Sequence, residues 1–549
     1  MNDIQLVLAL LVGVVALSTL ARRIHVPYPI VLVLGGLLLG AISDLPQVKL
    51  APDVVLLLFL PPLVYATAWQ TSVRDLRANL RSILLLSIGL VVFTVLVVAN
   101  VSSRAIAELG VLPAFVLPAF VLGAVVSPTD TVAAEAIITR LSMPRRIVTV
   151  LEGESLINDA TGLVAYTFAV DVAINGAGSF SAPSIALAFV VASVGGVAIG
   201  LAVGIVAAWA QRRIGDVPTG IMFSLLVPYA AYLPSQLPHL PVPVSGVLAA
   251  VTAGLYGGWK EPTTLSSDQR LQAFSVWSTV TFIVNGLIFI LVGLQLRPIG
   301  ANLLDPRQYP GDRVPYSPAT LVWYAALVAL LVIVVRILWV FPGTYLPRLL
   351  SRRLRARDPY PGWRNVVVVA WTGMRGGLSL AAALALPARG DLSRSQVNLI
   401  TFLVFGVILG TLVVQGLTLP VLIVRLRLSD DSAATDREEA TARLAAMRAV
   451  LAQLSDAPPM EGASPEGVEH LRAYYEKRAD HLASHLDGGA GDGVSLSEGA
   501  DPVHDLRQLK REMLGVERRT VIGLRNRSAI GDETMRRIEH DLDLEEARS

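Results

Sequence analysis

The sequence places carboxylates inside long apolar stretches, where few charges are expected. Asp130 lies in the run SPTDT at 127–131, and Asp159 ends the run EGESLIND at 152–159. A charged side chain at the centre of a membrane helix costs roughly 2.5–3.5 kcal/mol on insertion scales, so such residues usually serve a function. Carboxylate, hydroxyl and carbonyl oxygens are hard ligands for cations, and a carboxylate can hold a proton instead. The two runs therefore indicate a pathway for a monovalent cation or a proton.

The elements that carry these residues are expected to be helices, one of them interrupted. Pro128 lacks a backbone N–H, so it disrupts the helix beside the first carboxylate and frees carbonyl groups there. At 3.6 residues per turn, Ser155 and Asp159 share one helix face, and Glu154 and Asn158 share a neighbouring face. The second run is therefore expected to present its polar atoms to the interruption of the first.

A third run, WTGMRGG at 371–377, contains three glycines in its last five residues, around Arg375. The glycines predict a weak or unwound helix, and a buried arginine there requires a carboxylate partner. Arg336, the other arginine inside an apolar stretch, has no partner that the sequence identifies. Ion pairs that only hold helices together are the alternative interpretation. The carboxylates outnumber the arginines, however, and this surplus favours an ion pathway that includes Asp130 and Asp159.

The composition separates a membrane body from a polar tail. Of 549 residues, 53% are hydrophobic and 16% are charged, against about 25% charged in soluble proteins. The net charge of +2 divides into +11 over residues 1–428 and −9 over residues 429–549. The absence of cysteine excludes disulfides, thiol catalysis and cysteine-bound metal centres. About 20 apolar residues cross a bilayer, and the body contains thirteen candidates: 4–21, 26–43, 52–66, 82–102, 112–137, 147–173, 184–210, 219–234, 241–257, 273–296, 319–346, 365–387 and 397–424.

The distribution of Lys and Arg between the loops predicts the orientation. With the N-terminus outside, the inner loops hold eighteen of these residues and the outer loops hold seven, in agreement with the positive-inside rule. The first segment lacks the basic start of a signal peptide and is expected to remain as a span. Spans five and twelve, the two interrupted ones, are seven apart and so cross in opposite directions. Paired broken helices in inverted repeats are a recurring transporter architecture, with the ion site where the breaks meet.

Residues 1–428 resemble the sodium/proton exchanger branch of the monovalent cation/proton antiporters. The resemblance rests on five runs that occur in order: FLPPL at 59–63, PTD at 128–130, GESLIND at 153–159, NGLIFILVG at 285–293 and GMRGG at 373–377. It implies an all-α polytopic membrane protein of about 13 transmembrane helices, with an inverted-repeat antiporter fold and two crossed discontinuous helices. It also implies a homodimer in the plasma membrane, a cytoplasmic helical tail and a role in pH homeostasis.

The resemblance implies a role for each polar residue of the site. Asp159 would be the principal cation- and proton-binding carboxylate. Na⁺ would bind at four residues, of which one contributes its carbonyl oxygen: Asp159, Asp130, Ser155 and Thr129 (carbonyl). Asn158 is typical of the electroneutral exchangers, and Glu154 would pair with Arg375 to join spans six and twelve. Many relatives carry an acidic residue after the Pro-Pro pair of span three, but residues 65–69 contain none here.

The implied activity is exchange of Na⁺ or Li⁺ for H⁺ by alternating access, with cation and proton competing for Asp159. It involves no enzymatic reaction, no cofactor and no nucleic acid; the partners are the monovalent cation, the lipid bilayer and a second copy. A K⁺/H⁺ antiporter is the closest alternative. Alternatives of another class are an intramembrane aspartyl protease and a sodium-coupled solute symporter, although the body lacks a Gly-x-Gly-Asp catalytic segment.

The tail, residues 429–549, is expected to form a small helical appendage. An apolar stripe with spacings of three, four and three predicts an amphipathic helix: Leu444, Met447, Leu451 and Leu454. Residues 465–485 and 502–528 are expected to form two further helices, joined by a Gly-, Ser- and Asp-rich linker at 487–501. Support of a dimer and regulation by pH or a partner are the hypotheses for its role.

Overall fold

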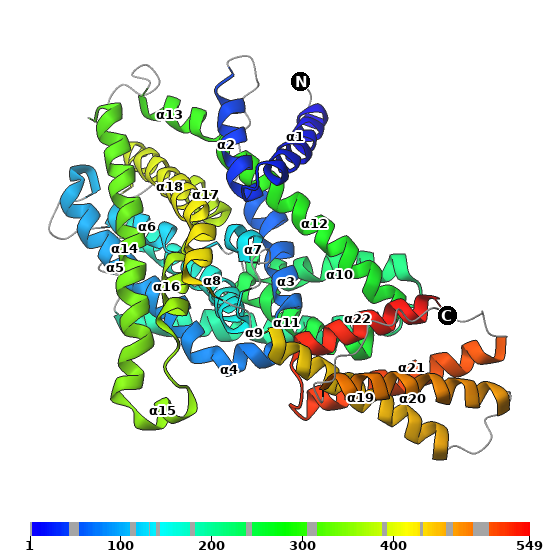
Figure 1. Ribbon diagram of the computed structural model, residues 1–549. Coiled ribbons are helices and arrows are strands. Elements are labelled where there is room, and N and C mark those ends of the chain that lie inside the picture. Colours follow the sequence, from blue (N-terminus) through cyan, green and yellow to red (C-terminus); the bar gives the residue numbers. More distant parts are fainter. Residues whose placement is uncertain are drawn as a thin grey trace. The chain divides into compact units, whose positions relative to one another are not determined.

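The computed structural model shows a chain made of helices (Figure 1). It describes residues 3–42, 54–109, 117–130, 132–138, 143–175, 182–237, 244–304, 316–386, 392–428, 432–456, 465–486 and 504–548. The chain divides into two compact units. Unit 1 contains Met1–Arg213, Met222–Trp259 and Val276–Ser429, and unit 2 contains Ile214–Ile221, Lys260–Ser275 and Asp430–Ser549.

All thirteen apolar segments overlap helices. The first ten helices are α1 (Asp3–Arg23), α2 (Tyr28–Gly40), α3 (Leu60–Gln70), α4 (Val73–Leu84), α5 (Leu90–Ala105), α6 (Leu117–Val126), α7 (Val132–Ile138), α8 (Arg145–Asn175), α9 (Ala182–Gln211) and α10 (Val217–Tyr232). The next eight are α11 (Gly246–Thr264), α12 (Ser267–Leu294), α13 (Leu296–Leu304), α14 (Pro318–Leu350), α15 (Arg352–Arg357), α16 (Trp363–Trp371), α17 (Gly377–Leu384) and α18 (Arg394–Leu426). Short π-helical stretches precede α3 (Val54–Phe59) and join α4 to α5 (Leu85–Gly89).

Several of these helices have the length and composition of membrane spans. In the described part of the chain, seven are long and apolar enough to cross a bilayer: Gln5–Arg23, Val73–Ala105, Ala186–Gln211, Val217–Gln236, Ser267–Gly300, Pro318–Leu350 and Arg394–Leu426. Large apolar side chains such as Val12 and Leu187 are exposed on α1 and α9, which suits contact with lipid. An all-helical, multi-span membrane protein is thus confirmed, whereas the count of thirteen spans stays a prediction.

Two apolar segments are interrupted where Pro128 and the glycine-rich run indicate. The backbone is not helical at 127–130, between α6 and α7, nor at 372–376, between α16 and α17. Around these breaks α6 packs against α5 and α8, and α18 packs against α14 and α17. A Cβ atom at Gly162 of α8 would collide with the ring of Pro128, so this glycine lets α8 approach the first break. The buried core of unit 1 therefore holds the interruptions in place.

Unit 2 contains the four helices of the tail: α19 (Ser432–Asp456), α20 (Pro465–Leu486), α21 (His504–Asn526) and α22 (Asp532–Arg548). The apolar stripe of α19 packs as its spacing predicts, with Met447 and Leu454 buried against Tyr475 of α20 and Met513 of α21. The helix α22 was not predicted. The linker at 487–501 lies outside the described residues.

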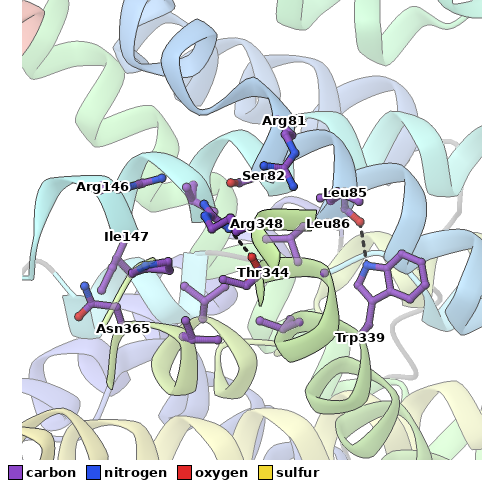
Figure 2. Close-up of a pocket in the computed structure, with 16 residues that line it drawn as sticks. Arg81, Ser82, Leu85, Leu86, Arg146, Ile147, Trp339, Thr344, Arg348 and Asn365 are labelled. Carbon is purple, nitrogen blue, oxygen red and sulfur yellow. Dashed lines mark hydrogen bonds between the residues drawn. The ribbon is translucent and has the colours of Figure 1, made fainter. Parts of the chain in front are cut away.

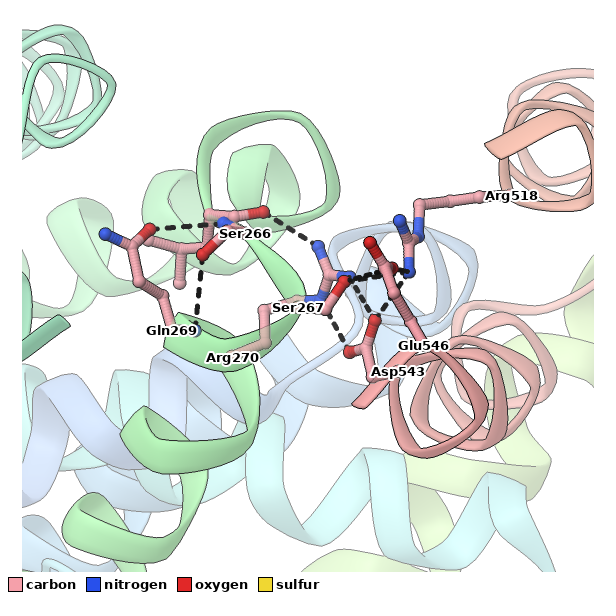
Figure 3. A network of polar contacts seen from close by, with 8 residues as sticks. Ser266, Ser267, Gln269, Arg270, Arg518, Asp543 and Glu546 are labelled. Atoms are coloured by element: carbon pink, nitrogen blue, oxygen red, sulfur yellow. Dashed lines mark hydrogen bonds and ion pairs between the residues drawn. The ribbon is translucent and has the colours of Figure 1, made fainter. Parts of the chain in front are cut away.

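A buried polar network joins α21 and α22 to the segment Lys260–Ser275 within unit 2 (Figure 3). The Arg270 guanidinium donates to the Asp543 carboxylate, with 2.9 Å between Nε and Oδ2. Arg518 Nη2 donates to the same carboxylate at 2.7 Å and to Glu546 Oε2 at 2.8 Å. The Ser267 hydroxyl also donates to Glu546, at 2.6 Å. The end of the tail is therefore tied to a segment that is continuous with α11 and α12.

Glu261, at the end of α11 and beyond the predicted span, is an acid of unit 2 with a perturbed pKa. Burial raises the pKa of Glu261 to about 7; Arg536 and Arg270 oppose the rise, and Glu539 and Asp543 add to it. Burial also raises the pKa of Glu539. Both acids hold a proton more tightly when α22 is packed against Lys260–Ser275 than they would in water.

Candidate functional site

The two interruptions meet in space and are joined by their backbones. The Asp130 N–H, in the first break, donates to the Met374 carbonyl, in the second, at 2.8 Å. The Asp130 carboxylate also accepts the N–H of Val132, the first residue of α7, at 2.8 Å. A Cβ atom at Gly376 would overlap the Asp130 side chain, so only glycine fits there. Asp130 therefore stands at the point where the broken helices contact each other.

Thr129 connects the first break to α8. Its carbonyl accepts a hydrogen bond from the Ser155 hydroxyl at 3.3 Å. Its hydroxyl accepts from Asn158 Nδ2 at 2.9 Å and donates to Glu154 Oε1 at 3.1 Å. Asn158 is fully buried, and its Oδ1 atom has no hydrogen-bond partner among the described residues. The polar runs of spans five and six thus form one hydrogen-bonded unit, as the two helix faces predict.

The arginine that neutralises Glu154 is Arg336, and the expected pair of Glu154 with Arg375 is wrong. Both members of the pair are 1% exposed. The Arg336 guanidinium donates to both carboxylate oxygens, with 2.8 Å between Nη2 and Oε2, and to the Val369 carbonyl at 3.0 and 3.1 Å. The sequence identified no partner for Arg336; in the structure α14 packs against α16, and the Arg336 side chain reaches Glu154 of α8.

Arg375 instead satisfies carbonyl groups that the breaks release. Its Nε atom donates to the carbonyl of Val126, the last residue of α6, at 2.7 Å, and Nη1 donates to the Gly373 carbonyl. Its backbone N–H donates to the Thr411 hydroxyl of α18 at 3.1 Å. An interrupted helix exposes carbonyl oxygens that need donors. This is why a buried arginine can sit here without a direct carboxylate partner.

A cavity of about 100 Å³ lies beside the breaks and brings together most of the expected site residues. Asp130, Asp159, Thr129 and Ser155 line it, and all except Asp159 make the contacts described above. Asn158 does not line it; it acts on the cavity only through Thr129. The structure therefore gathers the four expected Na⁺ ligands at one cavity and places Asn158 outside its lining.

Another part of the cavity lining comes from α3 and α12 and adds residues that the sequence did not single out. Thr67, Thr281 and Asn285 line the cavity, as does Ser379 of α17. The hydroxyls of Thr281 and Ser379 are buried and have no hydrogen-bond partner among the described residues. Thr67 is the polar group that α3 offers in place of the missing carboxylate. The sequence pointed to this part of the lining only through the NGLIFILVG run at 285–293, which contains Asn285.

The site suits a small monovalent cation better than a transition metal. Three carboxylates, those of Asp130, Asp159 and Glu135, and several neutral oxygens line the cavity. Among the described residues, no group of three or more His, Cys, Asp or Glu side chains gathers as a metal site would require. Neither Asp130 nor Asp159 forms an ion pair with a described arginine or lysine, since Arg336 and Arg375 bond elsewhere. A cavity with uncompensated carboxylates requires a cation or a proton.

Comparison with known proteins places the chain in a family. The family model "Sodium/hydrogen exchanger, transmembrane" matches residues 6–425. An uncharacterised Na⁺/H⁺ exchanger of Mycobacterium tuberculosis is 36% identical over 550 residues, covering 99% of this chain and 95% of that protein. A sodium, potassium, lithium and rubidium/H⁺ antiporter of Bacillus subtilis is 31% identical over 436 residues, covering 76% of this chain and 61% of that protein.

The fold is also similar to that of a solved structure. The sodium proton antiporter MjNhaP1 from Methanocaldococcus jannaschii superposes with a TM-score of 0.58 at 18% identity, covering 77% of this chain and 98% of that one. The chain therefore belongs to the sodium/hydrogen exchanger family, and it is a multi-span membrane transporter of monovalent cations and not an enzyme.

Proposed function

We propose that this transporter exchanges Na⁺ for H⁺ one for one, with both ions competing for Asp159. The observation that carries the proposal is the cavity where the two breaks meet. It holds Asp130 and Asp159 beside the oxygens of Thr129 and Ser155. Li⁺, which also prefers hard oxygen ligands, would share the site.

The mechanism follows from the charge balance of this cavity. Asp159 can be neutralised by a cation or by a proton, but not by both at once. Exposure of the cavity first to one side of the membrane and then to the other converts this competition into exchange. Asn158 is neutral and bonded to Thr129, so the residue before Asp159 adds no titrating charge, and Asp159 alone exchanges its proton for the cation in each cycle. Each cycle then carries one positive charge in each direction, which makes the exchange electroneutral.

The test is proton movement in everted membrane vesicles that contain a pH-sensitive dye. Wild-type protein should dissipate an acid interior when Na⁺ is added, whereas Asp159→Asn should abolish the response. Asp171→Asn is the matched control, because it makes the same change on α8 at a residue that does not line the cavity. Cation-dependent proton movement by Asp159→Asn at the wild-type rate would refute the assignment.

K⁺ is the second candidate ion. The Bacillus subtilis relative is named for potassium as well as sodium, and the absence of a carboxylate in residues 65–69 leaves fewer charged ligands to select ion size. The vesicle assay with Na⁺, Li⁺ and K⁺ in parallel decides between them.

The same assay tests for a sodium-coupled symporter, which would respond to Na⁺ only when its solute is present. Membership of a transporter family removes the aspartyl protease alternative.

The orientation is proposed from the loop charges: N-terminus outside and tail in the cytoplasm. The chain has no cysteine, so single-cysteine variants need no background changes. A membrane-impermeant maleimide applied to intact cells should label Ala105→Cys, at the end of α5, and should not label Ser484→Cys in the tail. The opposite pattern would invert the topology.

A homodimer is proposed from the family resemblance, and single-molecule photobleaching in two steps would support it.

A further inference from the structure

Three arginines from different helices gather at a second cavity of unit 1 (Figure 2). Arg81 comes from α4, Arg146 from the first turn of α8 and Arg348 from the last turn of α14. The cavity measures about 80 Å³, well above the roughly 10–15 Å³ that a single water needs. We call these three arginines and the cavity that they line the arginine pocket.

The charges of the arginine pocket are only partly compensated. Asp358 holds two of the arginines: Arg146 Nη2 lies 2.5 Å from its carboxylate, and Arg348 donates to the same carboxylate and, at 3.2 Å, to its carbonyl. Arg81 Nη2 is buried and has no hydrogen-bond partner among the described residues. Three positive charges against one negative charge leave a net +2 around the cavity. The pocket is therefore built to receive an anion with at least one more acceptor group.

The donor set points to a phosphate group. Guanidinium groups present paired N–H donors that match phosphate oxygens. Ser82 and Asn365, which also line the pocket (Figure 2), add a hydroxyl and an amide as neutral donors. A carboxylate ligand has two oxygens, whereas a phosphate can engage donors from three helices at once. Asp358 fixes two of the guanidinium groups, so little side-chain freedom is lost when the anion binds.

The surroundings of the arginine pocket indicate that a lipid carries this phosphate. The floor of the pocket is apolar, with Leu86, Val150 and Val366 among the lining residues. Next to Arg348, Leu349 and Leu350 are 67% and 77% exposed, and Trp363, at the start of α16, is 59% exposed. Exposed leucine and tryptophan side chains at helix ends beside arginine are typical of the membrane interface, where headgroups lie.

We propose that the arginine pocket binds the phosphate of an anionic phospholipid headgroup, whose acyl chains lie along the exposed apolar side chains at the end of α14. Free phosphate could make the same hydrogen bonds. The exposed apolar side chains near the pocket, Leu349, Leu350 and Trp363, favour a lipid, because only a lipid has acyl chains to cover them. The site is separate from the cation cavity and shares no lining residue with it. The proposal therefore does not depend on which ion is transported.

The test is lipid binding by the detergent-purified full chain, measured by native mass spectrometry. Phosphatidylglycerol, phosphatidylcholine and inorganic phosphate are titrated separately. Wild-type protein should bind phosphatidylglycerol more tightly than phosphatidylcholine, and Arg81→Gln should weaken phosphatidylglycerol binding about tenfold. Arg77→Gln is the matched control, because it removes the same charge one turn earlier on α4 and does not line the pocket.

Two further outcomes separate the sources of the phosphate. Inorganic phosphate that displaces the lipid at micromolar concentration would overturn the lipid assignment in favour of a free anion. If Arg81→Gln and Arg77→Gln weaken phosphatidylglycerol binding equally, or if neither weakens it, the arginine pocket is not the binding site. If Arg81→Gln does not fold, Ser82→Asp provides the second variant: it adds a negative charge to the pocket and should give the same loss. Phosphatidylglycerol binding that is unchanged in Ser82→Asp would also count against the site.

Discussion

Replacement of Arg336 by methionine measures the pair that it forms with Glu154. Both side chains are 1% exposed, so loss of the guanidinium leaves a buried carboxylate without compensation, at a cost of about 3–5 kcal/mol. The Val369 carbonyl loses two donors as well, which adds roughly 1 kcal/mol. We therefore expect Arg336→Met to lower the free energy of unfolding by about 4–6 kcal/mol. Equilibrium unfolding in mixed micelles with increasing SDS measures this quantity.

A double-mutant cycle identifies the partner. Glu154→Gln removes the buried charge, so the double variant Glu154→Gln/Arg336→Met should recover at least about 2 kcal/mol of the loss. The same cycle with Arg375→Met should give a coupling energy below about 1 kcal/mol, because Arg375 donates to backbone carbonyls instead. A larger coupling energy for Arg375 than for Arg336 would refute the pairing described here.

Two other variants test the crossing and the tail network. Gly376→Ala should displace the Asp130 carboxylate and reduce ion exchange in the vesicle assay at least tenfold, roughly. Gly362→Ala is the control: an added Cβ meets nothing within 4 Å there, so exchange should be unchanged. A fully active Gly376→Ala would contradict the site geometry. Burial raises the pKa of Glu261 to about 7, so the packing of α22 on Lys260–Ser275 should be strongest at acid pH. The free energy of this packing should fall by at most about 3 kcal/mol as the pH rises toward about 7, and should stay constant above that pH. Hydrogen exchange of α22 between pH 5 and 8 measures this pH dependence. Glu261→Gln should reduce it, and the buried Glu539, whose pKa is also raised, accounts for the remainder. An unchanged profile in Glu261→Gln would show that Glu261 is not the responsible group.

The features that depend on local chemistry could be predicted from the sequence. Pro128 removes a backbone donor wherever it stands in a helix, and the glycines around Arg375 weaken any helix that contains them. Both interruptions therefore lie where expected. The shared face of Ser155 and Asp159 likewise follows from helical periodicity, and both line the cavity.

The features that depend on which helices become neighbours could not be predicted from the sequence. Glu154 had two arginines as possible partners, and only the passage of α14 beside α16 selects Arg336. Arg375 could not be assigned to carbonyl groups, because every helix has carbonyls and only the breaks release them. The same holds for Thr281, a hydroxyl in an apolar helix that resembles many others until α12 is placed beside the cavity.

The bond between Asp130 and Met374 also constrains how the two breaks can move relative to each other. Because this bond and the close approach at Gly376 join the two broken helices, a motion that displaces one break should displace the other with it. The wall from α3 and α12 contributes apolar side chains, among them Leu60, Val64 and Phe289, beside the polar Thr67, Thr281 and Asn285. Apolar contacts are non-directional, so the apolar part of this wall can shift relative to the breaks without loss of hydrogen bonds. If the cavity opens to each side of the membrane in turn, as proposed above, we expect the two breaks to move together, as one body, along this wall.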